Sequence, residues 1–502
     1  MTEQMTRRTL LTATAATLAA PALVPAAASA APRVPSAVRE LEDRIREAME
    51  LYAVPGVAFG LRYRGREYVR GFGVTSIADP SPVDGDTTVF RVASTTKTFT
   101  GTAAMRLVER GRLDLDRRVR AYLPGFRTSD PAASARVTVR QLLNHSAGWL
   151  GDYLLDTGSD DAALARYVAE MHRVPQLTPP GEVFSYNNAA ISVAGRVIEV
   201  VTGRTYEQAV EDLLLEPLGL RRSGFDITRI PGARMAVPHV IDEAGNLVAQ
   251  PERWSVPRSV NPAGGLISSA RDQLRWARFH LGDGGRLLSR RSLHAMRSHP
   301  GPGGTLFVEL DGAGVTWMLR PTAEGPTVVQ HGGDWDGQHS GFLMVPERDF
   351  ALTVLTNSDT GPALLDDLFI GDWALSRFAG VHNLPAVVRP VADLAGYAGS
   401  YTLQQIGFDG ELVSLVLEIV ADRGMLSVRV DGVEQMRLGF YRRDYAVVHL
   451  PDGTPTTQRV NFVRGRGGEV DWLRFGGRLL RRGGVAPLRT AGTLPFRLNP
   501  WI

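Results

Sequence analysis

The last part of the chain most constrains its fold, because it consists of short apolar–polar runs separated by turns. About eight such runs lie between residues 394 and 482, and no helical period interrupts them. The turn sequences between them include Asp409-Gly410, Asp431-Gly432 and Asp452-Gly453. Short strands at this spacing are typical of a sandwich or a small barrel, and a meander of this length predicts an up-and-down barrel. We therefore expect an all-β domain over residues 386–502.

Residues 31–385 have a different pattern, in which helical and strand-like segments mix. Helical spacing occurs at residues 37–49, 98–111, 189–201 and 270–281. Strand-like composition occurs at residues 57–74, which resemble a hairpin, and at residues 328–330, 342–345 and 350–356. Residues 380–390 contain two prolines and no strong period, so we expect a linker there. The sequence thus predicts a mixed domain followed by an all-β domain.

Residues 1–30 have the features of an export signal. Arg7-Arg8 precedes a stretch rich in Ala, Leu and Thr, and Ala28-Ser29-Ala30 provides a cleavage site. The twin arginine resembles a Tat signal, which is a receptor-read address for exporting folded proteins. A membrane anchor is the alternative, although an apolar stretch of about 17 residues is short for one. We expect a secreted or extracytoplasmic protein with no stable membrane span after the signal is removed.

The counts of ionisable residues narrow the classes of function. The chain has no cysteine, which excludes disulfides, thiolate catalysis and Cys-bound zinc or iron–sulfur clusters. With 56 basic and 53 acidic residues, it lacks the basic excess typical of a nucleic-acid-binding protein. All but one of the basic residues are arginine, and the single lysine is Lys97. Because lysine can lose its proton and arginine does not, Lys97 is a candidate for chemistry that arginine cannot perform.

Ser94 lies three residues before Lys97, where a strand-like stretch leads into a helical segment. On a helix these positions share a face, with Cβ atoms about 5–6 Å apart. A neutral lysine amine can take the proton of a serine hydroxyl and so turn it into a nucleophile. Neutrality near pH 7 requires the lysine pKa to fall by about three units, so we expect Lys97 in an apolar, hydrogen-bonded pocket. A surface Ser-x-x-Lys pair without function is the alternative.

Two further motifs carry side chains suited to the same chemistry. Tyr186 and Asn188 lie on a turn that leads into the helical segment 189–201. The phenol can relay a proton, and the amide can bind a substrate amide or hold Lys97. His331-Gly332-Gly333 follows the strand-like residues 328–330. The two glycines let an extended substrate lie against the backbone, and we expect His331 to supply a donor where negative charge arrives.

The order of these motifs, Ser-x-x-Lys, Tyr-x-Asn and His-x-Gly, resembles a known group of serine hydrolases. They are related to class C β-lactamases and low-molecular-weight penicillin-binding proteins, and they include D-Ala-D-Ala carboxypeptidases, D-aminopeptidases and carboxylesterases. Residues 138–148, 217–220 and 262–272 are also similar to segments of this family. The resemblance extends over residues 36–377. The strands that begin at residue 394 resemble the lipocalin-like domain often appended to these hydrolases.

The resemblance implies an α+β fold in which an antiparallel sheet flanked by helices and an all-helical part enclose the site. The expected organisation is a signal peptide at 1–30, a β-lactamase-like domain at 31–385 and a lipocalin-like barrel at 386–502. By this resemblance Ser94 is the acylated nucleophile, and Lys97 with Tyr186 forms the acid/base pair. The other implied contributors are Asn188 as an orienting residue, His331 with Gly332 and Gly333 in substrate binding, and the backbone N–H groups of Ser94 and Asp334 as oxyanion hole.

Two features of the sequence depart from or extend the family pattern. His331 stands where the β-lactamases have a lysine, so we expect penicillin turnover to be weak or absent. The His-x-Gly variant resembles the esterase and D-amino-acid-peptidase branches more. Trp149 and Trp335 flank two of the motifs, and each either lines an apolar acyl pocket or belongs to the core.

The sequence therefore predicts a secreted serine hydrolase that cleaves an amide or ester of a small molecule or short peptide, without metal or cofactor. No Gly-x-Ser-x-Gly elbow or His-Glu-x-x-His motif is present, and we expect His145, His172 and His239 to be structural. One alternative is a penicillin-binding-protein-type thioesterase or acyltransferase that cyclises peptides, which the export signal disfavours. Another is a non-catalytic β-lactam-binding protein, which would form no covalent adduct on Ser94.

Overall fold

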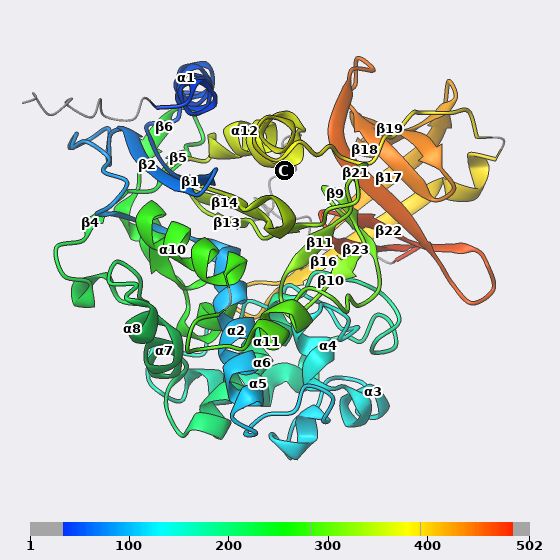
Figure 1. Cartoon of the computed structure of the whole chain (residues 1–502). Helices are drawn as coiled ribbons and strands as arrows, with labels where there is room; N and C mark the ends of the chain where they lie inside the picture. Colours follow the sequence, from blue (N-terminus) through cyan, green and yellow to red (C-terminus); the bar gives the residue numbers. More distant parts are fainter. Residues whose placement is uncertain (1–33, 283, 392, 485–502) are drawn as a thin grey trace, which may run out of the picture.

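The computed structural model describes residues 34–282, 284–391 and 393–484. The expected export signal at residues 1–30 lies outside these ranges. The described chain forms a mixed helix–sheet part, followed by a β-barrel that packs beside it (Figure 1). Within the described residues, no helix has both the length and the apolar character needed to cross a membrane.

An antiparallel sheet organises the mixed part, with strand order β10-β11-β12-β14-β15-β1-β2 and β13 paired to β14. Its strands are β1 (Gly56–Tyr63), β2 (Arg66–Gly73), β10 (Gly312–Ala313), β11 (Met318–Arg320), β12 (Val328–Gln330), β13 (Gly333–Trp335), β14 (Gln338–Val345) and β15 (Phe350–Thr356). The predicted hairpin at residues 57–74 is confirmed as β1–β2. Its two-residue turn, Arg64-Gly65, has φ of +50° and +73°, as a type I′ turn requires.

Helices cover both faces of this sheet, so β1 and β15 are buried along almost their whole length. On one face lie α1 (Ser36–Leu51) and α12 (Gly361–Leu365), and on the other lies α10 (Ala270–Leu281) (Figure 1). A side chain on Gly60 of β1 would come within 2.9 Å of the Ala270 carbonyl oxygen. The glycine therefore lets α10 pack closely on the sheet.

The helical part below the sheet is built around α2 (Thr96–Glu109) and α6 (Asn188–Thr202) (Figure 1). The helices around them are α3 (Pro131–Arg136), α4 (Val139–Leu143), α5 (Ala163–Glu170), α7 (Tyr206–Val210), α8 (Glu216–Leu218), α9 (Asn261–Gly264) and α11 (Arg290–Ala295). Side chains of Asn187, Thr205 and Ser269 cap α6, α7 and α10. Such caps satisfy N–H groups that have no partner within the helix, so they fix where each helix begins.

Short strands connect the sheet to the helical part. A small sheet has the order β4-β3-β7, and two hairpins, β5–β6 and β8–β9, stand apart from it. These strands are β3 (Thr88–Arg91), β4 (Arg234–Met235), β5 (His239–Ile241), β6 (Leu247–Ala249), β7 (Ile267–Ser268), β8 (Gly304–Leu306) and β9 (Val308–Leu310). The β8–β9 hairpin reaches the barrel, where Phe307 forms a bridge with Arg459.

The C-terminal strands close into a barrel in which each strand pairs with its neighbours in sequence and β16 pairs with β23. They are β16 (Gly399–Ile406), β17 (Leu412–Asp422), β18 (Met425–Val430), β19 (Val433–Arg442), β20 (Tyr445–His449), β21 (Pro455–Arg464), β22 (Val470–Phe475) and β23 (Arg478–Arg482). The predicted up-and-down barrel is thus confirmed. A cluster of buried apolar side chains, which includes Leu417, Leu438, Phe440 and Phe462, forms its core.

Candidate active site

Ser94 lies in a tight turn between a strand and a helix. Strand β3 leads to a 3-10 turn at Ala93–Thr95, and α2 follows directly. Ala93 has a φ of +44°, a conformation that is costly for a residue with a side chain. Ser94 is partly exposed, whereas its neighbours in the turn are buried. The turn therefore presents the Ser94 hydroxyl at the start of the helix, on the side open to a substrate.

Lys97 lies next to Ser94 on the first turn of α2 and is fully buried. Its Nζ lies 2.9 Å from Ser94 Oγ and donates a second hydrogen bond to the carbonyl oxygen of Ala263 at 2.7 Å. Burial holds the pKa of Lys97 well below its ordinary value, and the positive charge of Arg478 lowers it further. A neutral Lys97 amine keeps a lone pair that can accept the hydroxyl proton of Ser94.

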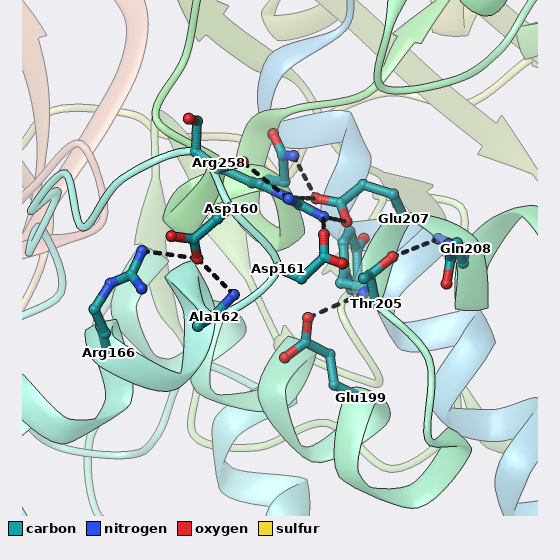
Figure 2. Close-up of polar contacts among 12 residues, drawn as sticks. Asp160, Asp161, Ala162, Arg166, Glu199, Thr205, Glu207, Gln208 and Arg258 are labelled. Atoms are coloured by element: carbon teal, nitrogen blue, oxygen red, sulfur yellow. Dashed lines mark hydrogen bonds and ion pairs between the residues drawn. The ribbon is translucent and has the colours of Figure 1, made fainter.

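The Ala263 carbonyl is fixed by contacts on the far side of α9. Glu207 on α7 accepts hydrogen bonds from Asn261 Nδ2 at 2.7 Å and from Arg258 at 3.1 Å. Arg258 also pairs with Asp161 at 2.8 Å, and Figure 2 shows Glu207 and Asp161 converging on this guanidinium. The Glu207 carboxylate thus holds the segment that carries the Ala263 carbonyl against Lys97.

Tyr186 lies beside Ser94 and Lys97, and its interaction with the Ser94 side chain partly offsets the rise in the pKa of its hydroxyl. Its ring centroid is 4.9 Å from Lys97 Nζ, and the ring stacks on His145 at 4.7 Å. Burial raises the pKa of Tyr186 above its usual range, so the phenol stays protonated at neutral pH. Lys97 is therefore a group whose lone pair can take up a proton, and Tyr186 is a group that can give one.

His145, which we expect to be structural, stacks on the ring of Tyr186. His145 is fully buried with a φ of +58°, and its Nδ1 accepts the backbone N–H of Asn187 at 2.9 Å. Burial holds its pKa well below the ordinary value. His145 is thus a neutral ring that supports one face of Tyr186. The Leu-Leu-x-His segment that ends at His145 is the sequence feature that could have pointed to this residue.

Asn188, the first residue of α6, is held by a carboxylate that the sequence did not single out. Its Nδ2 donates to Asp152 Oδ1 at 2.7 Å. The other oxygen of Asp152, whose side chain is buried, accepts a hydrogen bond from Arg478 Nε at 3.1 Å. The hydrogen bond to Asp152 fixes the Asn188 amide, and its role toward a substrate or Lys97 stays a prediction.

His331 follows β12, and its chemistry differs from the expected donor role. Its Nδ1 lies 2.7 Å from the Gly332 carbonyl oxygen, so Nδ1 carries the proton and Nε2 presents a lone pair. Burial lowers the pKa of His331 to about 3. The ring is therefore neutral at physiological pH, because an imidazolium would be desolvated there. It presents an acceptor, not a positive charge, at this position.

Strand β13 forms the edge opposite Ser94. A side chain on Gly333 would lie 2.6 Å from the backbone nitrogen of Ser94 and 2.3 Å from the Val92 carbonyl oxygen, so only glycine fits there. Trp335 and Gln338 close the two-residue turn between β13 and β14 as a hydrogen-bonded pair. In an antiparallel ladder the next pair along the strands, Asp334 and His339, is then a non-hydrogen-bonded pair. The Asp334 N–H then faces away from β14, as a second oxyanion donor beside the Ser94 N–H requires.

The two tryptophans flanking the motifs have different environments. Trp149 is fully buried in the core of the helical part, so it belongs to the core. Trp335 is partly exposed, and its ring lies 5.9 Å from that of Phe408, which follows β16 of the barrel. Trp335 and Phe408 together form an apolar surface where the two domains meet.

Comparison with known proteins places this geometry in a family. The family model described as Beta-lactamase matches residues 41–373. The chain belongs to the beta-lactamase family. It is 36% identical over 361 residues to Penicillin-binding protein 4 of Amycolatopsis lactamdurans, covering 69% of this chain and 93% of that protein. It is also 25% identical to Protein flp of Staphylococcus aureus strain MW2, covering 66% of this chain and 65% of that protein.

Solved structures are similar to this chain in fold. The crystal structure of SurE with D-Leu has a TM-score of 0.68 and 28% identity, and the match covers 89% of this chain and 99% of SurE. A D-amino acid amidase from Ochrobactrum anthropi SV3, complexed with D-phenylalanine, has a TM-score of 0.54 and 25% identity, covering 64% and 92% of the two chains. The predicted fold class, a β-lactamase-like domain followed by a barrel, is confirmed.

The described residues of this beta-lactamase-family chain contain no group of three or more His, Asp or Glu side chains that could hold a metal ion. Two charged residues of the site, Asp152 and Arg478, escaped the sequence analysis. They are separated by 326 positions, and Arg478 belongs to the barrel. Neither lies in a motif, so the only signal was the Gly476-Gly477 turn immediately before Arg478.

Proposed function

We propose that this chain is an extracytoplasmic serine hydrolase that cleaves an amide or ester through an acyl-enzyme on Ser94. The observation that carries the proposal is the buried amine of Lys97, 2.9 Å from the Ser94 hydroxyl, with a pKa held well below its ordinary value. A lysine in that state is a base at neutral pH, and an isolated surface pair would not be.

Acylation follows from the positions of the side chains. Lys97 takes the proton of Ser94 as its Oγ attacks the substrate carbonyl carbon, and the carbonyl oxygen becomes an oxyanion. The N–H groups of Ser94 and Asp334 stabilise that charge, an interaction typically worth about 3–4 kcal/mol per donor. The carbon–leaving-group bond then breaks, and the leaving group receives a proton from Tyr186, which regains one from Lys97. The product of this half-reaction is an ester between Ser94 and the acyl group.

Deacylation uses the same groups in reverse. A water molecule gives a proton to Lys97 and attacks the ester carbonyl carbon, and Ser94 Oγ leaves with a proton. The released product is a carboxylic acid. Because each step moves one proton between Ser94, Lys97 and Tyr186, the cycle ends with the side chains in their starting states.

D-Amino-acid peptides and simple carboxylic esters are the substrates that we propose. Two similar proteins were solved with D-Leu and D-phenylalanine, which supports a D-configured residue next to the scissile bond. The apolar surface of Trp335 and Phe408 suits an apolar acyl group. Since His331 is neutral, it offers no fixed charge for a penicillin carboxylate, and we expect slow or no penicillin turnover.

An extracytoplasmic location is part of the proposal and rests on residues 1–30 alone. A twin-arginine start, an apolar stretch and an Ala-Ser-Ala site support Tat export. Fractionation of producing cells, with N-terminal sequencing of the mature protein, tests this. We expect a start at Ala31 in the extracytoplasmic fraction, and a full-length cytoplasmic protein would contradict it.

A substrate panel tests the reaction. We would compare kcat/KM for short-chain nitrophenyl esters, D- and L-amino-acid anilides, acyl-D-Ala-D-Ala and a chromogenic cephalosporin. In parallel, a fluorophosphonate should label the wild type and leave Ser94→Ala unlabelled. Labelling without turnover of any substrate would favour a β-lactam-binding protein, and retained turnover in Ser94→Ala would overturn the mechanism.

A second candidate is acyl transfer to an amine, as in peptide-cyclising thioesterases of the penicillin-binding-protein type. The observation that favours it is the two-domain layout, a β-lactamase-like domain followed by a barrel, which we expect of such thioesterases. An added amine, such as a D-amino-acid amide, distinguishes the two. If aminolysis product accumulates at the expense of acid, transfer is the main reaction, and if only acid forms, hydrolysis is.

A further inference from the structure

The β22–β23 turn of the barrel reaches the floor of the active site. Gly476 and Gly477 have φ of +51° and +76°, as a type I′ turn requires. The Gly477 carbonyl oxygen accepts the backbone N–H of Tyr186 at 2.8 Å. A side chain on Gly477 would come within 2.8 Å of Leu306 and 3.2 Å of Tyr186. The turn therefore fits the catalytic domain closely at the residue that donates the proton.

Arg478, the next residue, is held in one orientation over Tyr186. Its guanidinium carbon lies 4.6 Å from the Tyr186 ring centroid. Its Nε donates to Asp152 Oδ2 at 3.1 Å, and its Nη1 donates to the Gly476 carbonyl oxygen at 2.9 Å. With 15% of its side chain exposed, Arg478 is poorly hydrated, which strengthens its electrostatic effect on nearby groups.

Asp152 belongs to the catalytic domain and contacts the barrel through both its side chain and its main chain. Its backbone carbonyl oxygen accepts a hydrogen bond from the Ile406 N–H at 2.8 Å. The Leu154 N–H donates a hydrogen bond to the Ile406 carbonyl oxygen at 2.9 Å. Its side chain, 2% exposed, joins Arg478 to Asn188. Barrel contacts therefore fix both the main chain and the side chain of Asp152.

We propose that Arg478 is a positioning residue of the catalytic centre, supplied by the barrel, which orients the Tyr186 ring and places a fixed positive charge against the same ring that Lys97 Nζ faces at 4.9 Å. This inference rests on the proposed acyl-enzyme function and deepens it. A fixed positive charge beside an amine disfavours its protonation, since a second positive charge would be repelled. The charges that face Lys97 are Arg478, which lowers its pKa, and Asp152 and Asp334, which raise it.

The single lysine of the chain makes a direct measurement possible. Protein labelled with ¹³Cε-lysine gives one side-chain NMR signal, from Lys97, whose titration reports its pKa without any substrate. In Arg478→Gln we expect this pKa to rise by about one unit, because the neighbouring positive charge is lost. Arg481→Gln is the matched control, since Arg481 lies on the same strand, exposed, over Trp472. An unchanged Lys97 pKa in Arg478→Gln would overturn the electrostatic role.

Kinetics on nitrophenyl butyrate, which carries no carboxylate, test the orienting role. We expect kcat of Arg478→Gln to fall at least about tenfold with little change in KM, and the acidic limb of its pH profile to move to higher pH. Arg478→Lys keeps the positive charge but cannot bridge Tyr186 and Asp152 in the same way. The acidic limb of its pH profile should therefore stay at the wild-type pH while kcat falls. It also serves as the test if Arg478→Gln does not fold.

The results separate the possible failures. If wild-type protein is active and Arg478→Lys retains full kcat, the orienting role is overturned while the proposed function stands. If only KM rises, and only for substrates that bear a carboxylate, Arg478 is a substrate contact and the inference fails. If wild-type protein neither labels nor turns over, the proposed function fails, and the NMR titration still decides whether Arg478 sets the pKa of Lys97.

Discussion

The buried amine of Lys97 donates a hydrogen bond to the Ala263 carbonyl oxygen at 2.7 Å while it lies 2.9 Å from Ser94 Oγ. This arrangement fixes the direction of its lone pair. An amine that gives one proton to a carbonyl and has no room to be hydrated can accept from the serine hydroxyl. The position of α9 is therefore as important to the base as the spacing of Ser94 and Lys97.

Lys97→Arg should leave the fold intact and remove the activity. A guanidinium stays protonated, so it has no lone pair to offer the Ser94 hydroxyl at the place where the Lys97 amine lies 2.9 Å from Oγ. We expect kcat/KM on nitrophenyl esters to drop by about 10³-fold or more, with an unchanged far-UV CD spectrum. A fully active Lys97→Arg enzyme would show that this lysine is not the base.

Glu207→Gln should slow catalysis from a position behind the site. The change weakens the charged contact to Arg258 and so loosens the segment that carries the Ala263 carbonyl. We expect kcat to fall by about tenfold and the acidic limb of the pH profile to shift, because the Lys97 contact is less well held. Glu211→Gln is the matched control, since Glu211 makes an exposed ion pair with Arg229. Equal kinetics in the two variants would contradict this role of Glu207.

The pH dependence of kcat/KM should have an acidic limb and a broad alkaline plateau. Activity requires neutral Lys97, so it rises with pH through the lowered pKa of that amine. The raised pKa of Tyr186 keeps the phenol protonated well above neutral pH, so no loss is expected there. Tyr186→Phe should lower kcat by about 10²-fold and leave the acidic limb in place. A limb that disappears in Tyr186→Phe would assign it to the tyrosine.

His331 should make the folded protein sensitive to acid. Its pKa is about 3 in the folded state, below its ordinary value, so between these values the unfolded chain binds more protons. The contribution of His331 to the free energy of unfolding is fully present above the pKa of the unfolded state. It is lost as the pH falls toward 3, by up to ~1.4 kcal/mol per pH unit. Urea unfolding of His331→Gln between pH 7 and pH 4 should show a smaller loss than the wild type. Parallel losses would contradict a buried neutral His331.

Local sequence predicted the elements whose geometry depends on neighbouring residues. The Arg64-Gly65 turn, the helix that carries Lys97 and the strands of the barrel follow from residue type and period alone. The close spacing of Ser94 and Lys97 is likewise a property of one helical turn. Sequence reasoning could not find the Asp152–Arg478 pair, because a 326-residue separation is closed only when the barrel docks.

The sequence by itself singled out the proposed nucleophile and base, because a serine and the single lysine stand three residues apart at the start of a helix. It also determined that a barrel follows a mixed domain. Only the tertiary structure decided the protonation states, since the charges of Lys97 and His331 depend on how completely distant segments exclude water from them. It also decided that the barrel contributes Arg478 to the site, because packing, and not spacing, brings these segments together.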